Sequence, residues 1–569
     1  MKSGYWVVLL GIAVLCGCSP RQGMKPNGPA APPDLAAQAQ EFRKEVIRVA
    51  EGVYVAVGFG LANSVLLEGR DGVVIVDTME SAEAARPVKE AFAQISAKPV
   101  KAIIYTHFHT DHTFGTRILA GDHRPEIWAH ESTEYWLNRV ATITREAVYR
   151  RSLRQFGSLL PAEEFLHSGI GPRLVFDANV TPALVFPNRT FSGERAELDI
   201  SGIRMVLIHA PGETPDQIIV WLPDKKILLA ADNFYNSFPN LYAIRGTAYR
   251  DVNLWIRSLD IMRELRADHL VPLHTRPISG GDRIYETLTN YRDAIQFVHD
   301  QTIRWMNAGL LPEEIVSKVI LPPHLAGLPY LREYYGTVAW SVRGVFDGYM
   351  GWFGGNATDL FPLPPGERAS RLADLAGGKQ ALLEKARQAF SAGDHQWALE
   401  LTDPLRRLDP ENQEIRNLKG AALRALGLKQ NAATARNYYL TQAREEEGKL
   451  HPGKAPLAVD REMIQRLPME FFFRSLSVRL DPEKSGGVNQ IVGFRFPDTG
   501  EAFGFHVRRG VAEIQPRFPE KADIAVTVDS GAWKEMLTGM RSPVLAIGKD
   551  LKVEGGTLNF VRFLTLFQD

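Results

Sequence analysis

The pattern of apolar and polar residues divides the chain into three regions. From Val53 to about residue 285, short β-branched runs alternate with turn residues and helical stretches, which is typical of an α/β domain. Over residues 286–445, apolar residues recur at helical spacing almost throughout. From residue 456 to 569, helical and extended runs alternate again, which predicts a separate α+β domain.

Within the first region the runs predict individual elements. Residues 69–72 are turn formers between two apolar runs and favour a hairpin. A helix is expected over 81–95 and a helix-rich insert over 131–166. The expected strands are 53–57, 64–68, 73–77, 101–105, 203–208, 218–222 and 226–231.

The first forty residues predict a targeting segment. Residues 1–17 carry one early lysine, an apolar run too short to span a bilayer and small residues, as a secretory signal does. The ending resembles a bacterial lipobox, which implies a lipoprotein-type signal, lipidation of Cys18 and, with serine at position 19, an outer-membrane lipoprotein in the periplasm. The alternative is an ordinary secretory signal that is cleaved nearby, with no lipid on Cys18. Residues 18–40 are rich in proline and alanine and predict a solvated tether.

The composition is that of a globular protein with several domains. The 569 residues are 45% hydrophobic and 23% charged, and at about 150 residues per domain they allow three to four domains. The 66 Lys and Arg balance the 66 Asp and Glu, which argues against a nucleic-acid partner. Both cysteines, Cys16 and Cys18, fall in the targeting segment, so any metal site must use His, Asp and Glu.

The strongest chemical signal follows the strand expected at 101–105. His107, His109, Asp111 and His112 lie within six positions there. Residues two apart in an extended chain point the same way, so His107 and His109 can bind one ion. Asp111 and His112, further along the turn, can bind a second ion close to the first.

Two ions need further ligands, and three residues at the ends of expected strands can supply them. Glu213 lies in HAPGET (209–214), Asp232 ends the run ILLAAD, and His274 ends LVPLH. Each alone is more often a cap or turn residue. Together with the histidine cluster they complete three ligands for each ion and one bridge.

These motifs resemble the metallo-β-lactamase superfamily and, more specifically, the alkyl sulfatases that hydrolyse detergents of the dodecyl sulfate type. The opening of the last region, LPMEFFFRSLSVRLD (467–481), resembles a sterol carrier protein type 2 domain. The other segments that carry the resemblance are THFHTDH (106–112), HAPGET, NLYAIRG (240–246), YRDAIQFVHDQT (291–302), YYGTV (334–338), GWFGGN (351–356) and LAGG (375–378).

The resemblance covers nearly the whole chain after the targeting segment and implies three domains. It implies an αββα metallo-β-lactamase sandwich, of the α/β class, over residues 41–285. An all-α dimerisation domain over residues 286–445 and an α+β sterol-carrier-like domain over residues 456–569 would follow.

By position, the resemblance also implies two zinc ions per chain. Glutamate at position 213 is the sulfatase residue, because lactamase-type enzymes usually have histidine there. The family usually has glutamate at the bridging position and a histidine and a tryptophan after the last ligand, where this chain has Asp232, Thr275 and Arg276. We expect Asp232 to shorten the bridge and Thr275 and Arg276 to reshape the pocket rim, so that the substrate range differs. The implied ligands are His107, His109 and Glu213 for the first zinc, Asp111, His112 and His274 for the second, and Asp232 as the bridge.

The expected charges call for a separate cation beside the metals. Two zinc ions carry +4 and the three carboxylates carry −3, and the remaining +1 lowers the pKa of a shared water toward about 7. Once hydroxide forms, the cluster is neutral and attracts an anionic sulfate only weakly. Arg245 is the candidate, since a guanidinium donates two parallel hydrogen bonds to sulfate oxygens. Asn240 can add a neutral donor, although a loop-anchoring Arg and Asn pair is the alternative. The expected catalytic residues are therefore Asp111, Asn240 and Arg245.

The sequence thus predicts zinc-dependent hydrolysis of an amphiphilic alkyl sulfate ester to an alcohol and inorganic sulfate by a metal-activated hydroxide. It also predicts a homodimer formed through the helical domain and a lipid anchor in the membrane. A dinuclear zinc hydrolase of another ester, a lactone, a β-lactam or a phosphoester is the alternative on the same fold, and a non-enzymatic lipid carrier is the third hypothesis. The phenylalanines at 471–473 and beyond are expected in a hydrophobic core, in an apolar groove for alkyl tails, or in both.

Overall fold

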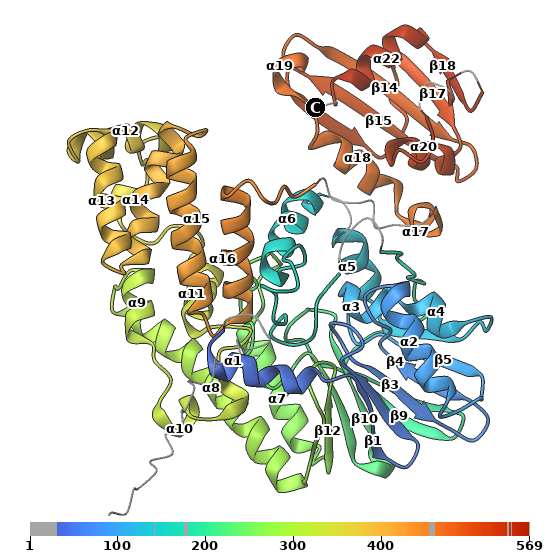
Figure 1. Cartoon of the computed structure of the whole chain (residues 1–569). Helices are drawn as coiled ribbons and strands as arrows, with labels where there is room; N and C mark the ends of the chain where they lie inside the picture. The colour runs from blue at the N-terminus through green and yellow to red at the C-terminus, as the bar shows by residue number, and fades with distance from the viewer. Residues whose placement is uncertain are drawn as a thin grey trace, which may run out of the picture.

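The computed structural model describes residues 31–140, 143–175, 180–453, 461–542, 546–547 and 549–567. The expected signal, Cys18 and the first part of the tether lie outside these residues. Figure 1 shows a β-rich body, a helical region beside it and a C-terminal domain above the β-rich body. Among the described residues, no helix has the length and apolar character needed to cross a membrane.

The first region folds into two β-sheets. In the seven-stranded sheet the first four strands are antiparallel, and β4 to β7 run parallel. Its order is β1 (Glu45–Ala50), β2 (Val53–Val57), β3 (Ser64–Glu68), β4 (Val73–Val76), β5 (Val100–Ile104), β6 (Glu126–His130) and β7 (Arg189–Phe191). The second sheet has the order β13 (Ile278–Ser279), β12 (His269–Pro272), β11 (Ile227–Ala231), β10 (Ile218–Leu222), β9 (Ile203–His209) and β8 (Arg195–Ile200).

A continuous apolar layer joins the two sheets. Val55 and Val74 of the first sheet and Leu207, Val220 and Leu229 of the second are fully buried in one cluster. Because strand side chains alternate between faces, the opposite faces need separate cover. The four residues of β4 are all buried, as expected for a strand covered on both sides.

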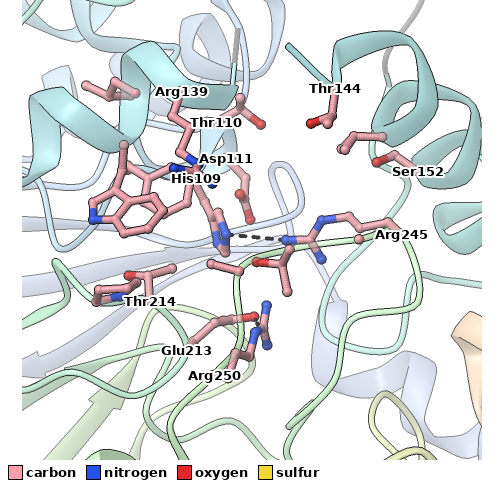
Figure 2. A pocket seen from close by; sticks show the side chains of 18 of the residues that line it. His109, Thr110, Asp111, Arg139, Thr144, Ser152, Glu213, Thr214, Arg245 and Arg250 are labelled. Atoms are coloured by element: carbon pink, nitrogen blue, oxygen red, sulfur yellow. Dashed lines mark hydrogen bonds and ion pairs between the residues drawn. The ribbon is translucent and has the colours of Figure 1, made fainter. Parts of the chain in front are cut away.

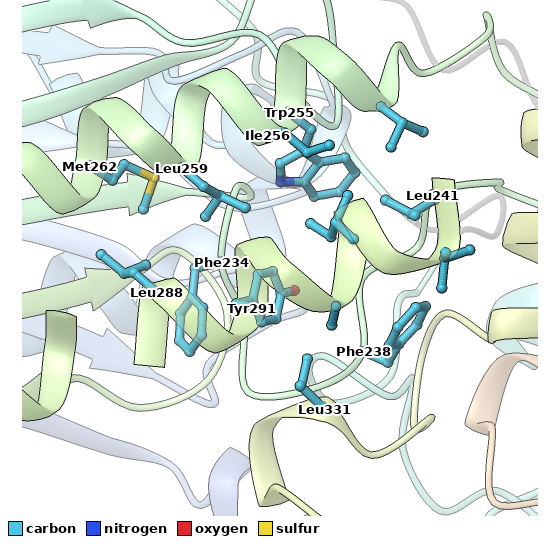
Figure 3. Close-up of a cluster of buried hydrophobic side chains, with 14 of the residues drawn as sticks. Phe234, Phe238, Leu241, Trp255, Ile256, Leu259, Met262, Leu288, Tyr291 and Leu331 are labelled. Atoms are coloured by element: carbon cyan, nitrogen blue, oxygen red, sulfur yellow. The ribbon is translucent and has the colours of Figure 1, made fainter. Parts of the chain in front are cut away.

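Helices cover the outer face of each sheet. The cover of the first sheet includes α2 (Ala82–Ala93), whose Phe92 packs with Ile75 of β4. The second sheet is covered by α7 (Val252–Glu264) and α8 (Gly281–Asn307) through Trp255 and Tyr291 (Figure 3). The αββα sandwich expected from the sequence is therefore confirmed. The remaining helices of this region are α3 (Thr110–Thr113), α4 (Thr116–Ala120), α5 (Thr133–Val140), α6 (Arg145–Phe156) and the 3₁₀ helix η2 (Pro223–Lys225).

The helical region continues from the sandwich without a break. The border expected between residues 285 and 286 falls inside α8, and one apolar cluster joins Trp255 of α7 to Val345 further along the chain. The later helices are α9 (Pro312–Lys318), α10 (Pro323–Ala326), η3 (Pro329–Leu331), α11 (Val338–Met350), η4 (Ala357–Asp359), α12 (Pro365–Leu375), α13 (Lys379–Ser391), α14 (His395–Leu408), α15 (Gln413–Leu428) and α16 (Ala433–Glu446).

The C-terminal domain has its own α+β core. Phe473, Phe494, Phe496 and Phe505 are at most 1% exposed within one cluster, so these phenylalanines form a core. The sheet order is β16 (Val511–Gln515), β15 (Glu501–Arg508), β14 (Asn489–Phe496), β17 (Ile524–Val528) and β18 (Leu551–Glu554). The helices are α17 (Arg461–Arg466), α18 (Met469–Ser477), α19 (Pro482–Ser485), α20 (Ser530–Leu537) and α22 (Thr557–Thr565).

The end of the expected tether is folded. Residues from Pro33 form α1 (Pro33–Gln38) and the 3₁₀ helix η1 (Ala39–Phe42). Leu35 is fully buried, and its carbonyl lies 2.8 Å from Nε2 of His167. Residues 33–40 of the expected tether are therefore folded, because the apolar Leu35 and Phe42 anchor this segment to the body.

Candidate active site

The chain leaves β5 and enters a short loop that carries the histidine cluster. His107 and His112 are fully buried, and Asp111 is 8% exposed. The single turn α3 begins after His109 and places Asp111 and His112 one turn further along. The structure thus puts the four residues where the sequence expects them, at the carboxyl end of a buried strand.

The other three ligand-type residues approach from the second sheet. Glu213 follows β9, Asp232 follows β11 and His274 follows β12. These three strands point the same way, so their carboxyl ends meet at one edge of the sheet. All three side chains are at least 97% buried.

The seven residues form two groups whose ligand atoms lie within 4.8 Å of one another inside each group. His107, His109, Glu213 and Asp232 make the first group, and Asp111, His112 and His274 make the second. Oδ2 of Asp232 lies 3.9 Å from Nε2 of His107, 3.6 Å from that of His112 and 3.1 Å from that of His274. Asp232 therefore reaches both groups, as a bridge must.

Outer hydrogen bonds orient the imidazoles of the second group. His112 donates from Nδ1 to the carboxylate of Asp77 at 2.6 Å, and His274 donates from Nδ1 to the carbonyl of Leu61 at 2.8 Å. Both rings then present Nε2 to the site. Asp77 is held in turn by the backbone amide and the hydroxyl of Thr106. Sequence reasoning missed Asp77, although it ends an apolar strand just as Asp232 does.

Arginines flank the first group. Nη2 of Arg245 lies 3.3 Å from Nε2 of His109, and Arg250 pairs with Glu213 at 2.6 Å (Figure 2). The backbone amide of Arg245 is fixed by the side chain of Gln155 on α6. Nothing in the sequence pattern singled out Arg250, because its pairing with Glu213 spans distant segments.

His107 and His109 of the first group and His112 of the second have pKa values shifted in opposite directions. Burial lowers the pKa of His107 to about 3 and holds that of His109 well below its usual range. Burial also disfavours the charged form of His112, but the carboxylates of Asp232, Asp111 and Asp77 outweigh it and raise its pKa well above the usual range. The first pair of histidines is therefore neutral before a metal binds.

A cavity of about 580 Å³ opens onto the first group and has a mainly apolar wall. His109, Asp111, Glu213 and Arg245 line its polar end. Apolar side chains from α5 and α6 form part of the wall, and so do Met463 of α17 and Leu467 just after it. The sandwich and the C-terminal domain thus build one cavity together.

Three residues expected at the pocket do not line this cavity. Asn240 is 2% exposed, and its carbonyl accepts a hydrogen bond from Arg250 at 2.5 Å. Thr275 is 1% exposed, and its hydroxyl accepts from the amide of Asn236. Arg276 pairs with Glu45 of β1 at the sheet edge. Thr275, Arg276 and Asn240 are therefore absent from the lining of this cavity, and the contact of Asn240 with the site that the structure shows is its carbonyl on Arg250.

Comparisons with known proteins match this organisation. Family models match for the metallo-β-lactamase superfamily over residues 57–274, alkyl sulfatase dimerisation over 311–449 and the alkyl sulfatase C-terminal region over 458–569. A linear primary-alkylsulfatase of Pseudomonas sp. (strain ATCC 19151) is 40% identical over 88% of this chain and 98% of its own length. The chain belongs to the alkyl sulfatase family. It is therefore an enzyme of a hydrolase family within the metallo-β-lactamase superfamily.

More distant members of the alkyl sulfatase family agree over most of the chain. An alkyl/aryl-sulfatase of Saccharomyces cerevisiae is 30% identical over 96% of this chain and 86% of its own length. The solved structure of a stereoselective inverting sec-alkylsulfatase from Pseudomonas sp. superposes with a TM-score of 0.87 at 29% identity, covering 95% of this chain and 87% of that one. The likeness to these two proteins thus extends over all three regions of this chain.

Proposed function

We propose that this alkyl sulfatase family member hydrolyses alkyl sulfate esters of the dodecyl sulfate type to an alcohol and inorganic sulfate. The observation that carries the proposal is the convergence of seven ligand-type side chains, of which His109, Asp111 and Glu213 line the polar end of a mainly apolar cavity together with Arg245. An amphiphilic sulfate ester has this same division between a charged head and an apolar tail. The names of the relatives, which include primary and secondary alkylsulfatases, support the same substrate class.

The donor set fits two zinc ions. Nitrogen and carboxylate oxygen donors suit zinc, and each group offers at least three of them. Three buried atoms of the ligands, Nε2 of His112, Oε2 of Glu213 and Oδ1 of Asp232, have no hydrogen-bond partner among the described residues. Buried polar atoms are costly when unpaired, so a bound metal accounts for their arrangement. When bound, zinc ions supply Lewis acidity and make hydroxide available at neutral pH.

The chain's own residues supply binding and orientation. Arg245 offers its guanidinium to the sulfate oxygens beside His109, and Nη1 of Arg245 has no hydrogen-bond partner among the described residues. The apolar wall takes up the alkyl chain and excludes water, which strengthens every charge interaction at the polar end.

Sulfate release from dodecyl sulfate by the purified protein tests this proposal. We expect activity that a chelator abolishes and that zinc restores, together with about two metal ions per chain by elemental analysis. A metal-loaded protein that releases no sulfate across a series of chain lengths, but cleaves a lactone, a β-lactam or a phosphoester, would instead support the other dinuclear hydrolase. Absence of bound metal would favour the lipid carrier.

We also propose that the chain forms a homodimer through its helical region. Trp352, Phe361 and Leu375 are 75%, 96% and 85% exposed there, and the matching family model is named for dimerisation. Large exposed apolar side chains on a folded surface favour a protein interface. Light scattering after gel filtration measures the mass, and Phe361→Asp is expected to shift it toward the monomer.

Export and lipid anchoring through Cys18 remain a proposal from the sequence. Its test is the distribution of the protein between membrane and soluble fractions, with Cys18→Ser expected to release it into the soluble periplasmic fraction.

A further inference from the structure

The turn that follows β4 carries a buried carboxylate, Glu80, that is not one of the seven ligand-type residues. Glu80 is 4% exposed, and both of its carboxylate oxygens accept the backbone amide of Leu61 at 3.2 Å. The carbonyl of the same Leu61 accepts Nδ1 of His274 at 2.8 Å. Leu61 is therefore bound through its amide to Glu80 and through its carbonyl to a residue of the second ligand group.

The backbone of this turn has an unusual conformation. Asp77 and Met79 have φ angles of 58° and 75°, which residues other than glycine rarely adopt. Between them, Thr78 donates its amide and its hydroxyl to the carbonyl of His112, and Asp77 accepts Nδ1 of the same histidine. The turn thus fixes one imidazole of the second ligand group directly, and Glu80 at its end contacts the residue that holds the other.

The carboxylate of Glu80 lies against the backbone of Gly60, the residue before Leu61. A Cβ at position 60 would collide with both carboxylate oxygens of Glu80 and with the terminal methyl group of Met79. Glycine permits this close approach of a side chain to the backbone. The atoms in the way are the ends of flexible side chains, and Gly60 does not have a left-handed φ. An alanine at position 60 would therefore displace the carboxylate without straining its own backbone.

We propose that Glu80 is a positioning residue for His274, which holds the Leu61 carbonyl in place and thereby keeps Nε2 of His274 directed at the second ligand group. This inference rests on the proposed function for the presence of zinc. A hydrogen bond to Nδ1 fixes the tautomer and the ring orientation of a ligating imidazole. A residue that fixes the acceptor of this bond therefore orients the ligand without touching metal or substrate.

Removal of the carboxylate is expected to weaken the binding of one of the two zinc ions. Glu80→Ala releases the Leu61 amide, and we expect about tenfold weaker binding of that ion, the lower end of the effect of losing an outer partner of a ligand. The affinity of the other ion should not change. Glu80→Gln retains an oxygen acceptor for the amide and is expected to restore the affinity to within about threefold of the wild type.

Two measurements follow these variants. Competition with a chromophoric chelator gives the affinity of each zinc ion, and the visible absorption of cobalt-substituted protein reports the ligand geometry. We expect an altered cobalt spectrum in Glu80→Ala and a spectrum like that of the wild type in Glu80→Gln. The matched control is Glu535→Ala, which removes an equally buried carboxylate, also 4% exposed, from the C-terminal domain and is expected to change neither measurement.

Gly60→Ala tests the same contact without replacing Glu80. We expect the alanine to push the carboxylate away from the Leu61 amide and to weaken the same zinc ion as Glu80→Ala does. Because both changes break one contact, the double variant should lose about as much affinity as either single variant. Additive losses, or zinc affinities in Glu80→Ala equal to those of the wild type, would overturn the inference.

Two further outcomes separate the inference from its alternatives. Weaker binding of both zinc ions, with no recovery in Glu80→Gln, would mean that Glu80 only supports the fold, which also overturns the inference. If the expected losses are found in a protein that hydrolyses no alkyl sulfate, the inference stands and the proposed function fails. A wild type that binds no zinc contradicts both.

Discussion

The two ligand groups have opposite neighbours. The second group is backed by acceptors, the carboxylate of Asp77 behind His112 and the carbonyl of Leu61 behind His274. The first group is flanked by cations, Arg245 beside His109 and Arg250 beside Glu213. Acceptors make an imidazole a better metal donor, whereas cations oppose metal binding and attract anions.

This difference assigns separate tasks to the two sides of one centre. The acceptor-backed group is suited to holding a metal tightly, although its Asp111 also lines the cavity. The arginine-flanked group faces the cavity, where the sulfate group must arrive. Changes on one side should therefore alter metal binding, and changes on the other should alter substrate binding.

The largest expected effect comes from replacing Asp232, the residue that the two ligand groups share. Because its carboxylate reaches both groups, Asp232→Ala removes a ligand from each. We expect activity to fall by about a thousandfold or more and the metal content to fall below two per chain. Sulfate release and elemental analysis measure both. Asp71→Ala, on the exposed hairpin turn, is the control, and full metal content in Asp232→Ala would contradict a bridging role.

Removing the cation from the first group should affect substrate and spare metal. Arg245→Ala is expected to lower kcat/KM for an alkyl sulfate by about a hundredfold, since a charge-assisted hydrogen-bond pair is lost. Elemental analysis should find the metal content unchanged. Unchanged kinetics would show that Arg245 does not bind the sulfate group. Loss of metal would show that Arg245 also supports metal binding, so that the two functions are not separated.

A change behind the second ligand group is expected to weaken metal binding and to leave substrate binding unchanged. Asp77→Asn weakens the hold on His112, and we expect about tenfold weaker binding of one of the two metals. Competition with a chromophoric chelator measures this affinity. With metal in excess, KM for dodecyl sulfate should match the wild type, and a raised KM would argue that Asp77 also shapes the substrate site.

The sequence predicted those features of the site that depend on residues close together in the chain. Strands β2, β3 and β10 and the ligands at strand ends follow from apolar periodicity and short-range spacing. It did not predict the partners of those ligands, because Arg250 reaches Glu213 and Asp77 reaches His112 only through the tertiary fold. Closeness in sequence can also mislead. Arg276 is two residues from His274, which is in the site, but Arg276 itself pairs with Glu45 outside it.

The smallest expected effect concerns the part of the apolar wall that the C-terminal region supplies. Leu467 follows α17 and lines the cavity, so Leu467→Ala removes wall contacts from a long alkyl chain. Burial of one methylene contributes about 0.8 kcal/mol, so each lost contact should lower kcat/KM for dodecyl sulfate about fourfold. Short chains that do not reach α17 should react as before, with metal content and the inhibition constant of inorganic sulfate unchanged. Leu558→Ala, at a position 63% exposed in the same domain, is the control. An equal loss for short and long alkyl chains would mean that Leu467 supports the fold of the site and does not contact the end of a long alkyl chain.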